Sequence, residues 1–392
     1  MSLPVVASYC TTFLKPEMLH IYRQVTGLKR HRTFVVTRER ACAARFPFPE
    51  IEILPEARQP VLRRFYLKFL KRVPPLHYRG ELEQLSSLFG RRGADLMHVY
   101  FGHTGIHLRE FLKVWPQPSV VSFHGADVML HEHRPRYAAQ MRELFTLVPL
   151  VLARSRSLAD CLESAGCPPE KIRLNRTGIP LGDFAFVERR PPHDGAWRLV
   201  QACRLISKKG LHTTLQAFAQ FRSQFPKATL TIAGDGPMRR ELEEAARELG
   251  IADALTFAGF LPEAELRELY AGSHIFLHPS ETTAMQDQEG IPNSMIEAMA
   301  TGLPVAATLH GGIPEAVADG VSGLLVPEKT PDALASALIR LASSPGMAEE
   351  MGRRATQTVR EDFDQSPAIK KLEGLYDEAI SLGNPSARRQ YS

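Results

Sequence analysis

Short apolar runs alternate with helical patterns along nearly the whole chain, and this alternation restricts the possible folds more than any other feature. Residues 4–10 and 33–37 are apolar runs of strand length, and residues 16–26 between them have a helical pattern. A strand, helix, strand order of this kind is typical of a parallel sheet covered by helices. We therefore expect an α/β fold built from doubly wound sheets.

The alternation occurs in two separate sets. The first continues with runs at 95–101, 119–123, 148–153 and 171–175, and the second comprises 199–203, 228–233, 255–257, 275–277, 305–308 and 324–326. A chain of 392 residues exceeds what one hydrophobic core usually serves. We expect a first domain at 1–186, a polar, proline-containing linker at 187–196, a second domain at 197–365, an amphipathic helix at 366–383 and a disordered tail at 384–392.

Composition and charge limit the class of protein. There is no uncharged apolar run of about 18 residues and no signal-peptide pattern, so we expect a cytoplasmic protein. The five cysteines include no C-x-x-C pair, which favours reduced core thiols. Residues 1–190 contain 29 Lys and Arg against 17 Asp and Glu, a net charge of +12, whereas the whole chain carries +5. The basic first half suggests an acidic partner, although nothing resembles a nucleic-acid-binding module.

One segment of the basic half is strongly amphipathic. In residues 61–73, VLRRFYLKFLKRV, a helical projection places the apolar residues on one face and five basic residues on the other; the five are Arg63, Arg64, Lys68, Lys71 and Arg72. Such a helix could lie on an anionic membrane surface. It could equally pack its apolar face on the core of the first domain, and the segment alone does not decide between these interpretations.

The window from Glu289 to Glu297 contains two carboxylates, a glycine turn and the start of a helix. Ser294, followed three residues later by Glu297, has the spacing of a capping box that would open a helix at 295–301. A second glycine turn, His310-Gly-Gly-Ile-Pro-Glu315, has the same arrangement and predicts a second helix start. The unpaired N–H groups at a helix N-terminus suit a phosphate, and the neighbouring carboxylates would suit sugar hydroxyls.

The same window, EGIPNSMIEAMATGLPVAAT, resembles the E-x7-E motif of the GT4 family of retaining, nucleotide-sugar-dependent glycosyltransferases. The resemblance implies the GT-B architecture, in which two Rossmann-like domains face each other across a cleft. The first loop departs from the family pattern, because Thr11-Thr-Phe-Leu14 stands where many members have a Gly-Gly pair. That variant resembles a subgroup associated with extracellular and capsular polysaccharide assembly.

The resemblance also implies roles for individual residues. Glu289 would contact the transferred sugar and Glu297 the ribose, while the intervening turn would bind the sugar and diphosphate; the turn residues are Gly290, Ile291, Pro292, Asn293 and Ser294. In ACRLISKKG, Arg204 and Lys209 match the cations that bind the donor diphosphate. In FHGAD, His124 matches the histidine beside the transferred sugar. Asp127 and His103 are further candidates on the acceptor side, because each follows a predicted strand.

The reaction expected from these matches is transfer of a hexose from a UDP- or GDP-sugar to a glycan on a polyprenyl diphosphate carrier. A small-molecule acceptor and a non-catalytic sugar-nucleotide-binding protein remain alternatives. Gly234-Asp-Gly-Pro237 lacks the third glycine of a dinucleotide fingerprint, so we interpret it as a turn near the nucleotide. Asp287 and Glu289 could pass for a D-x-E metal site, but GT-B enzymes generally use no catalytic metal. We therefore expect neither a metal nor another cofactor.

Overall fold

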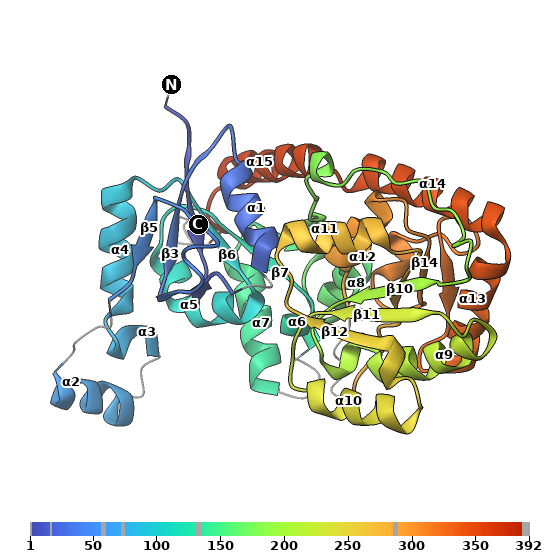
Figure 1. The fold of residues 1–392 in the computed structure, drawn as a ribbon. Helices are drawn as coiled ribbons and strands as arrows, with labels where there is room; N and C mark the ends of the chain where they lie inside the picture. Colours follow the sequence, from blue (N-terminus) through green and yellow to red (C-terminus); the bar gives the residue numbers. More distant parts are fainter. Residues whose placement is uncertain are drawn as a thin grey trace. The chain divides into compact units, whose positions relative to one another are not determined.

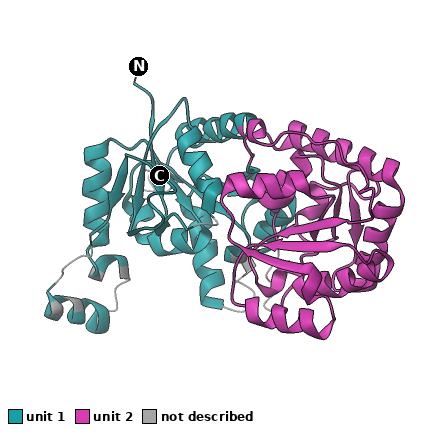
Figure 2. Ribbon diagram, in the orientation of Figure 1, with its two compact units in different colours: residues 1–177, 366–392 teal, residues 178–365 magenta. Residues whose placement is uncertain are grey.

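The computed structural model describes residues 2–15, 18–55, 60–71, 75–129, 135–284 and 289–385. Within them the chain divides into two compact units, residues 1–177 with 366–392 and residues 178–365 (Figure 2). We call them unit 1 and unit 2. Each contains one large parallel sheet, so the expected α/β class is confirmed.

Unit 1 is built on a seven-stranded sheet in the order β5-β3-β1-β6-β7-β8-β9, in which every pairing is parallel. Its strands are β1 (Val5–Tyr9), β3 (Arg32–Thr37), β5 (Ile51–Ile53), β6 (Leu96–Tyr100), β7 (Ser119–Phe123), β8 (Leu150–Ala153) and β9 (Ile172–Leu174). Its longer helices are α1 (Leu19–Gly27), α4 (Glu81–Arg92), α5 (Gly102–Val114), α7 (Pro135–Leu147), α8 (Arg156–Ser164) and α15 (Gln365–Leu382). Unit 1 also contains a short parallel pair, β2 (Thr12–Phe13) with β4 (Glu39–Arg40), the single turns α3 (Pro75–Tyr78) and α6 (Ala126–Met129), and the helix α2 (Val61–Phe65).

Both faces of the unit 1 sheet are buried, because successive side chains of a strand point to opposite faces. On one face Ala7 and Val99 join the core formed with α4, α5 and α7 (Figure 1). On the other face Val6, Leu96 and Val120 pack with residues of α15. This two-sided burial explains why these strands appear in the sequence as continuous apolar runs.

Unit 2 repeats the plan with a six-stranded parallel sheet in the order β12-β11-β10-β13-β14-β15. Its strands are β10 (Arg198–Ala202), β11 (Thr229–Ala233), β12 (Leu255–Gly259), β13 (Ile275–His278), β14 (Val305–Thr308) and β15 (Leu324–Val326). Its helices are α9 (Leu211–Gln224), α10 (Arg239–Glu248), α11 (Glu263–Gly272), α12 (Asn293–Ala300), α13 (Pro331–Ser343) and α14 (Pro345–Asp362). Leu199 and Val200, which are adjacent in β10, belong to separate buried clusters and so show the same two-sided burial.

The limits of the units differ from the predicted domain limits. Residues 178–186, which are predicted to be part of the first domain, belong to unit 2. There the N–H of Ile179 donates to the carbonyl of Phe363 at 2.9 Å, and Phe184 is buried in a unit 2 cluster. The polar segment 187–196 is also part of unit 2, where the Arg189 guanidinium donates to the carbonyl of Thr301 at 2.9 Å. Buried contacts of this kind cannot be inferred from a polar, proline-containing composition.

The C-terminal helix α15 belongs to unit 1. The Tyr376 hydroxyl lies 2.7 Å from Nδ1 of His98 in β6, and the Glu373 carboxylate accepts the backbone N–H of Lys29 at 2.7 Å. Asn384, predicted to begin a disordered tail, is buried and its amide donates to the carbonyl of Trp115. Residues 386–392 of that predicted tail lie outside the described residues.

The predicted helix at 61–73 is present as α2 (Val61–Phe65), which continues as the π-helical segment η2 (Tyr66–Leu70). Leu62 is 85% exposed and Leu70 is 66% exposed, and more than half of Phe65 and of Phe69 is exposed as well. The interpretation in which this apolar face packs on the core therefore does not describe the structure. Residues 72 and 73 of the predicted segment lie outside the described residues. None of the helices that the described residues form has both the length and the apolar character needed to span a bilayer.

Candidate active site

The turn after β10 places Lys209 at the carboxyl edge of the unit 2 sheet. A short 3-10 helix, Ser207–Lys209, leads to Gly210, which has a φ of 60°. A Cβ atom on Gly210 would lie 1.7 Å from the carbonyl oxygen of Pro279, just after β13, so only glycine fits. The close approach of this turn to the end of the neighbouring strand brings the Lys209 ammonium into an ion pair with the Glu289 carboxylate.

Both members of this pair are largely buried, with side chains 10% exposed for Lys209 and 14% for Glu289. Burial alone would raise the pKa of Glu289, but the charges of Lys209 and Lys208 outweigh it and lower the pKa to about 2. Glu289 is therefore ionised at neutral pH, and its oxygens can only accept hydrogen bonds.

The helix that follows Glu289 does not start as predicted. It is α12, from Asn293 to Ala300, and its N-cap is Pro292, without a side-chain cap. The Ser294 hydroxyl instead donates to the carbonyl of Ala202, the last residue of β10, at 2.6 Å. The capping-box prediction is wrong because the helix begins earlier, at Asn293, which places Ser294 beside the carbonyl at the end of β10. Ser294 thus fixes α12 to β10, which leads into the turn that carries Lys209.

Glu297 and Arg204 belong to the same region of unit 2. Glu297 lies in α12 and is buried. Burial raises the pKa of the nearby Tyr270 phenol, and the charge of Glu297 raises it further. Arg204 is exposed and comes two residues after the end of β10. The predicted turn from Gly234 lies against the same segment, since a Cβ on Gly234 would lie 1.8 Å from the carbonyl oxygen of Cys203.

The second glycine turn also differs from the prediction. His310-Gly-Gly leads only into a 3-10 turn, Ile313–Glu315, not into an α-helix. The chain instead turns back at Ala318, whose carbonyl accepts the N–H groups of Val321 at 3.0 Å and Ser322 at 2.9 Å, and enters β15 at Leu324. The side chain of His310 contacts Glu289 and Glu328, two residues far from it in sequence. From the sequence His310 is only a member of the glycine turn, because no spacing rule relates it to Glu328.

In unit 1 the candidate His124 follows β7 and forms a hydrogen bond through each ring nitrogen. Its Nδ1 lies 3.2 Å from Nε2 of His20 in α1, and its Nε2 lies 3.1 Å from the hydroxyl of Ser122. Burial, with the neighbouring His20 adding to it, places the pKa of His124 well below its ordinary value. His124 is therefore neutral at physiological pH, with its orientation fixed by α1 and β7. His20 is 104 residues from His124 in sequence, and no motif marks it as a partner.

Asp127 connects two strand ends of unit 1. Its carboxylate accepts the backbone N–H groups of Gly102 at 2.8 Å and of His124 and Gly125 at 2.9 Å each. These bonds fix the turn that carries His124 against the start of α5. His103, the second residue of that helix, is exposed, and its ring lies 5.6 Å from that of Phe101.

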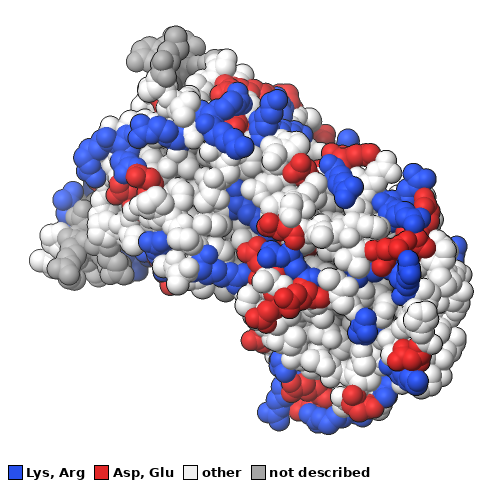
Figure 3. All heavy atoms as spheres, turned by 45° about the horizontal axis from the view of Figure 1, so that its top comes forward, with Lys and Arg blue, Asp and Glu red and all other residues white. Residues whose placement is uncertain are grey.

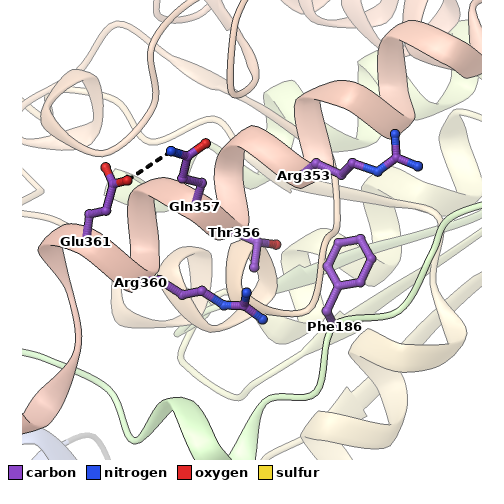
Figure 4. Close-up of a pocket in the computed structure, with 6 residues that line it drawn as sticks. All are labelled: Phe186, Arg353, Thr356, Gln357, Arg360 and Glu361. Carbon is purple, nitrogen blue, oxygen red and sulfur yellow. Dashed lines mark hydrogen bonds between the residues drawn. The ribbon is translucent and has the colours of Figure 1, made fainter.

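No group of three or more His, Cys, Asp or Glu side chains within the described ranges has a geometry that could hold a metal ion. Asp287, the first residue of the D-x-E pattern, lies outside the described residues. A pocket on α14 is lined by Phe186, Arg353, Thr356, Gln357, Arg360 and Glu361 (Figure 4). None of the predicted site residues lines it.

Comparison with known proteins identifies the family of the chain. Residues 185–358 match the model of the family described as glycosyl transferases group 1. The chain is 35% identical over 286 residues to the putative colanic acid biosynthesis glycosyltransferase WcaL of Salmonella typhimurium, covering 72% of this chain and 70% of that protein. It is 36% identical over 286 residues to the amylovoran biosynthesis glycosyltransferase AmsK of Erwinia amylovora, covering 71% and 69%.

Solved structures support the fold. A structure of Anabaena HepE in complex with UDP matches with a TM-score of 0.78 at 18% identity, covering 96% of this chain and all of that one. Sucrose-phosphate synthase from Thermosynechococcus elongatus matches with a TM-score of 0.75 at 18% identity, covering 97% of this chain and all of that one. The two parallel-sheet units are those of GT-B glycosyltransferases, as the sequence predicts. With its fold and its relatives in agreement, the chain belongs to the group 1 glycosyl transferases.

Proposed function

We propose that this glycosyltransferase transfers a hexose, with retention of configuration and without a metal, from a UDP- or GDP-sugar to a glycan on a polyprenyl diphosphate carrier. It would act in the cytoplasm, at the inner face of the membrane, in surface polysaccharide biosynthesis. The names of WcaL and AmsK support the polysaccharide class, and the UDP bound to HepE supports a nucleotide donor.

The observation that carries the proposal is the convergence of opposite charges at the carboxyl edge of the unit 2 sheet. Ligands of doubly wound sheets bind at this edge. The Lys209 ammonium would bind the donor diphosphate, with Arg204 as the second cation. The ionised Glu289 would accept hydrogen bonds from hydroxyls of the transferred sugar, and Glu297 would accept those of the ribose. The N–H groups at the start of α12 would add donors for the sugar and diphosphate.

The proposed chemistry follows from where charge develops. As the bond between the sugar C1 and the phosphate oxygen breaks, negative charge grows on the leaving diphosphate, and the fixed cations stabilise this transition state more than the ground state. The acceptor hydroxyl attacks C1 from the face that the diphosphate leaves, and its proton passes to the departing phosphate oxygen. His124 would lie beside the anomeric carbon as a neutral, oriented ring. A glycosyl-enzyme adduct in the intact mass after incubation with donor alone would contradict this mechanism.

The donor is identified by thermal shift against a panel of UDP- and GDP-sugars, followed by hydrolysis of the best ligand without acceptor. We expect one nucleotide class to stabilise the protein and its sugar to be released slowly. Lys209→Met should lower the hydrolysis rate about 100-fold, whereas Lys227→Met, at an exposed lysine of the same unit, should leave it unchanged. Binding without hydrolysis would favour the non-catalytic alternative, and loss of activity in EDTA with recovery in manganese would contradict metal independence.

We further propose that the segment 61–71 binds an anionic bilayer surface, where a lipid-linked acceptor would lie. Exposed apolar side chains at Leu62, Phe65 and Leu70 lie beside the exposed basic residues Arg63 and Lys68. Elsewhere, on the face drawn in Figure 3, acidic and basic side chains are interspersed. Apolar side chains that would enter the lipid, together with cations that attract its headgroups, are the two requirements of an interfacial helix.

The test is sedimentation with vesicles of phosphatidylcholine alone or with added phosphatidylglycerol. We expect binding only to the anionic vesicles, and about a tenfold loss or more in the variant Arg63→Gln, Lys68→Gln, Lys71→Gln, because each cation near the surface contributes about 1 kcal/mol. The variant Arg340→Gln, Lys370→Gln, Lys371→Gln removes the same charge from exposed helix positions elsewhere and should bind as the wild type does. Equal binding by all three proteins would exclude this surface.

A further inference from the structure

His310 connects the Glu289 turn to a second carboxylate. It follows β14, its side chain is almost fully buried, and its Nε2 lies 2.9 Å from the backbone nitrogen of Glu289. Because that backbone N–H is the donor, Nε2 is the acceptor and the ring proton is on Nδ1. Nδ1 lies 2.7 Å from Oε1 of Glu328, to which it donates. The two contacts together define one tautomer and one ring orientation.

Glu328 is itself fixed in place. Its carboxylate accepts the backbone N–H of Thr282 at 2.7 Å and the Thr282 hydroxyl at 3.2 Å. Burial opposes ionisation of Glu328, but these hydrogen bonds and that from His310 outweigh it and lower its pKa. A continuous chain of hydrogen bonds therefore runs from the segment after β13, through Glu328 and His310, to the backbone of Glu289.

The glycines after His310 hold the other side of the same peptide. The N–H of Gly312 donates to the carbonyl of Glu289 at 3.2 Å. Gly311 has a φ of 52°, and a Cβ on it would lie 2.0 Å from that carbonyl oxygen. The 310–312 turn thus binds both the N–H and the carbonyl of Glu289, while the Glu289 side chain is paired with Lys209.

We propose that His310, oriented by Glu328, is a positioning residue for the donor sugar. His310 acts through the backbone of Glu289. By fixing that backbone, it holds the Glu289 carboxylate in the position where the carboxylate pairs with Lys209 and would contact the sugar hydroxyls. The inference rests on the proposed function, in which Glu289 contacts the transferred sugar. It predicts a specific defect. Loss of His310 should weaken binding of the sugar. Binding of the nucleotide should stay nearly intact, because it depends on Glu297 in helix α12, which Ser294 fixes separately to β10.

The test compares His310→Leu with His310→Gln. Leucine fills a similar volume and makes neither hydrogen bond, whereas glutamine can accept the Glu289 N–H and donate to Glu328. The probes are UDP and GDP, and the UDP- or GDP-sugar that the wild-type protein binds in the panel, all measured by calorimetry. We expect His310→Leu to weaken the nucleotide sugar about tenfold or more and the nucleotide less than about twofold, with His310→Gln close to wild type.

Hydrogen exchange of the ligand-free protein gives a readout independent of the donor. The Glu289 amide should exchange faster in His310→Leu than in the wild type, and His310→Gln should restore its protection. Equal exchange in all three proteins, or equal loss of nucleotide and nucleotide sugar in His310→Leu, would overturn the positioning role. A wild-type protein that binds none of the nucleotides would instead overturn the proposed function, while the exchange result would still decide whether His310 fixes the turn.

Discussion

Removing Lys209 tests the electrostatics of the site most directly. In Lys209→Met the Glu289 carboxylate stays buried but loses the ammonium that is paired with it. Removing one member of a buried ion pair destabilises a protein more than removing both members. The reason is that the desolvation of the remaining ion is no longer compensated. We therefore expect unit 2 to lose stability in the single variant and to regain much of it in Lys209→Met, Glu289→Leu, where both charges are absent.

The magnitude follows from the pKa of Glu289, which falls from 4.5 to about 2 on folding. At about 1.36 kcal/mol per pKa unit, the ionised form contributes about 3.4 kcal/mol to stability at neutral pH. Since the folded-state pKa is the lower one, this contribution is fully present above pH 4.5 and is lost as the pH falls through 2. At pH 3 about 1.4 kcal/mol remains. Lys209 is the main cause of this lowered pKa, so at neutral pH Lys209→Met should lose most of this contribution, which corresponds to a Tm lower by about 10 °C.

The unfolding of each unit can be followed separately by fluorescence, because the two tryptophans lie in different units. Trp115 is in unit 1 and Trp197 is in unit 2. In a Trp115→Phe background, fluorescence during urea denaturation reports the unfolding of unit 2. We expect Lys209→Met to destabilise unit 2 by about 3 kcal/mol at pH 7 and by clearly less at pH 3. The reasoning would be refuted by a pH-independent difference, or by a double variant no more stable than Lys209→Met.

Three further predictions concern residues whose roles the structure defines. Ser294→Ala should destabilise unit 2 by about 1 kcal/mol, because the bond to the Ala202 carbonyl is lost, while the far-UV circular dichroism stays unchanged; a loss of helical signal would restore the capping role. Asp127→Asn should destabilise unit 1 by about 2–4 kcal/mol in urea denaturation followed at the unit 1 tryptophan, since three N–H groups lose a charged acceptor; a smaller effect would show that those bonds are weak. In steady-state kinetics Glu297→Ala should mainly raise the donor KM, whereas Glu289→Ala should lower kcat as well as raise the donor KM, because it removes the sugar contact that His310 positions; an unchanged kcat in Glu289→Ala would contradict its assigned role.

Much of the fold was predictable, because two-sided burial requires apolar residues at nearly every position of a parallel strand. The runs at 95–101 and 275–277 are examples, and their structural counterparts are β6 and β13. The strand β5 (Ile51–Ile53) went unnoticed because it is short and at the edge of the sheet, where no apolar run is needed. The sequence also predicted that Lys209 and Glu289 come near each other at the carboxyl edge of the second sheet, since each follows a strand, and the structure pairs them there.

Local patterns failed where a partner distant in sequence decided the outcome. Ser294 has the spacing of a cap but donates to a carbonyl 92 residues away. His310 bonds to Glu289 and Glu328 across gaps of 21 and 18 residues, so its role depends on how the ends of several strands meet. The exposure of the apolar face of α2 likewise required the structure, because helical periodicity shows that such a face exists and not what covers it.

The amino-acid sequence by itself determined the α/β class, the two sets of strands and the group of charged residues at their ends, since these follow from burial periodicity and from the motif between Glu289 and Glu297. Only the tertiary structure decided that Lys209 pairs with Glu289, that Ser294 joins α12 to β10 and that His310 fixes the Glu289 turn. The physical reason is the distance along the sequence over which each effect acts. Periodicity and turn chemistry act over a few residues, whereas a buried polar group bonds to whatever the packed fold brings within about 3 Å of it.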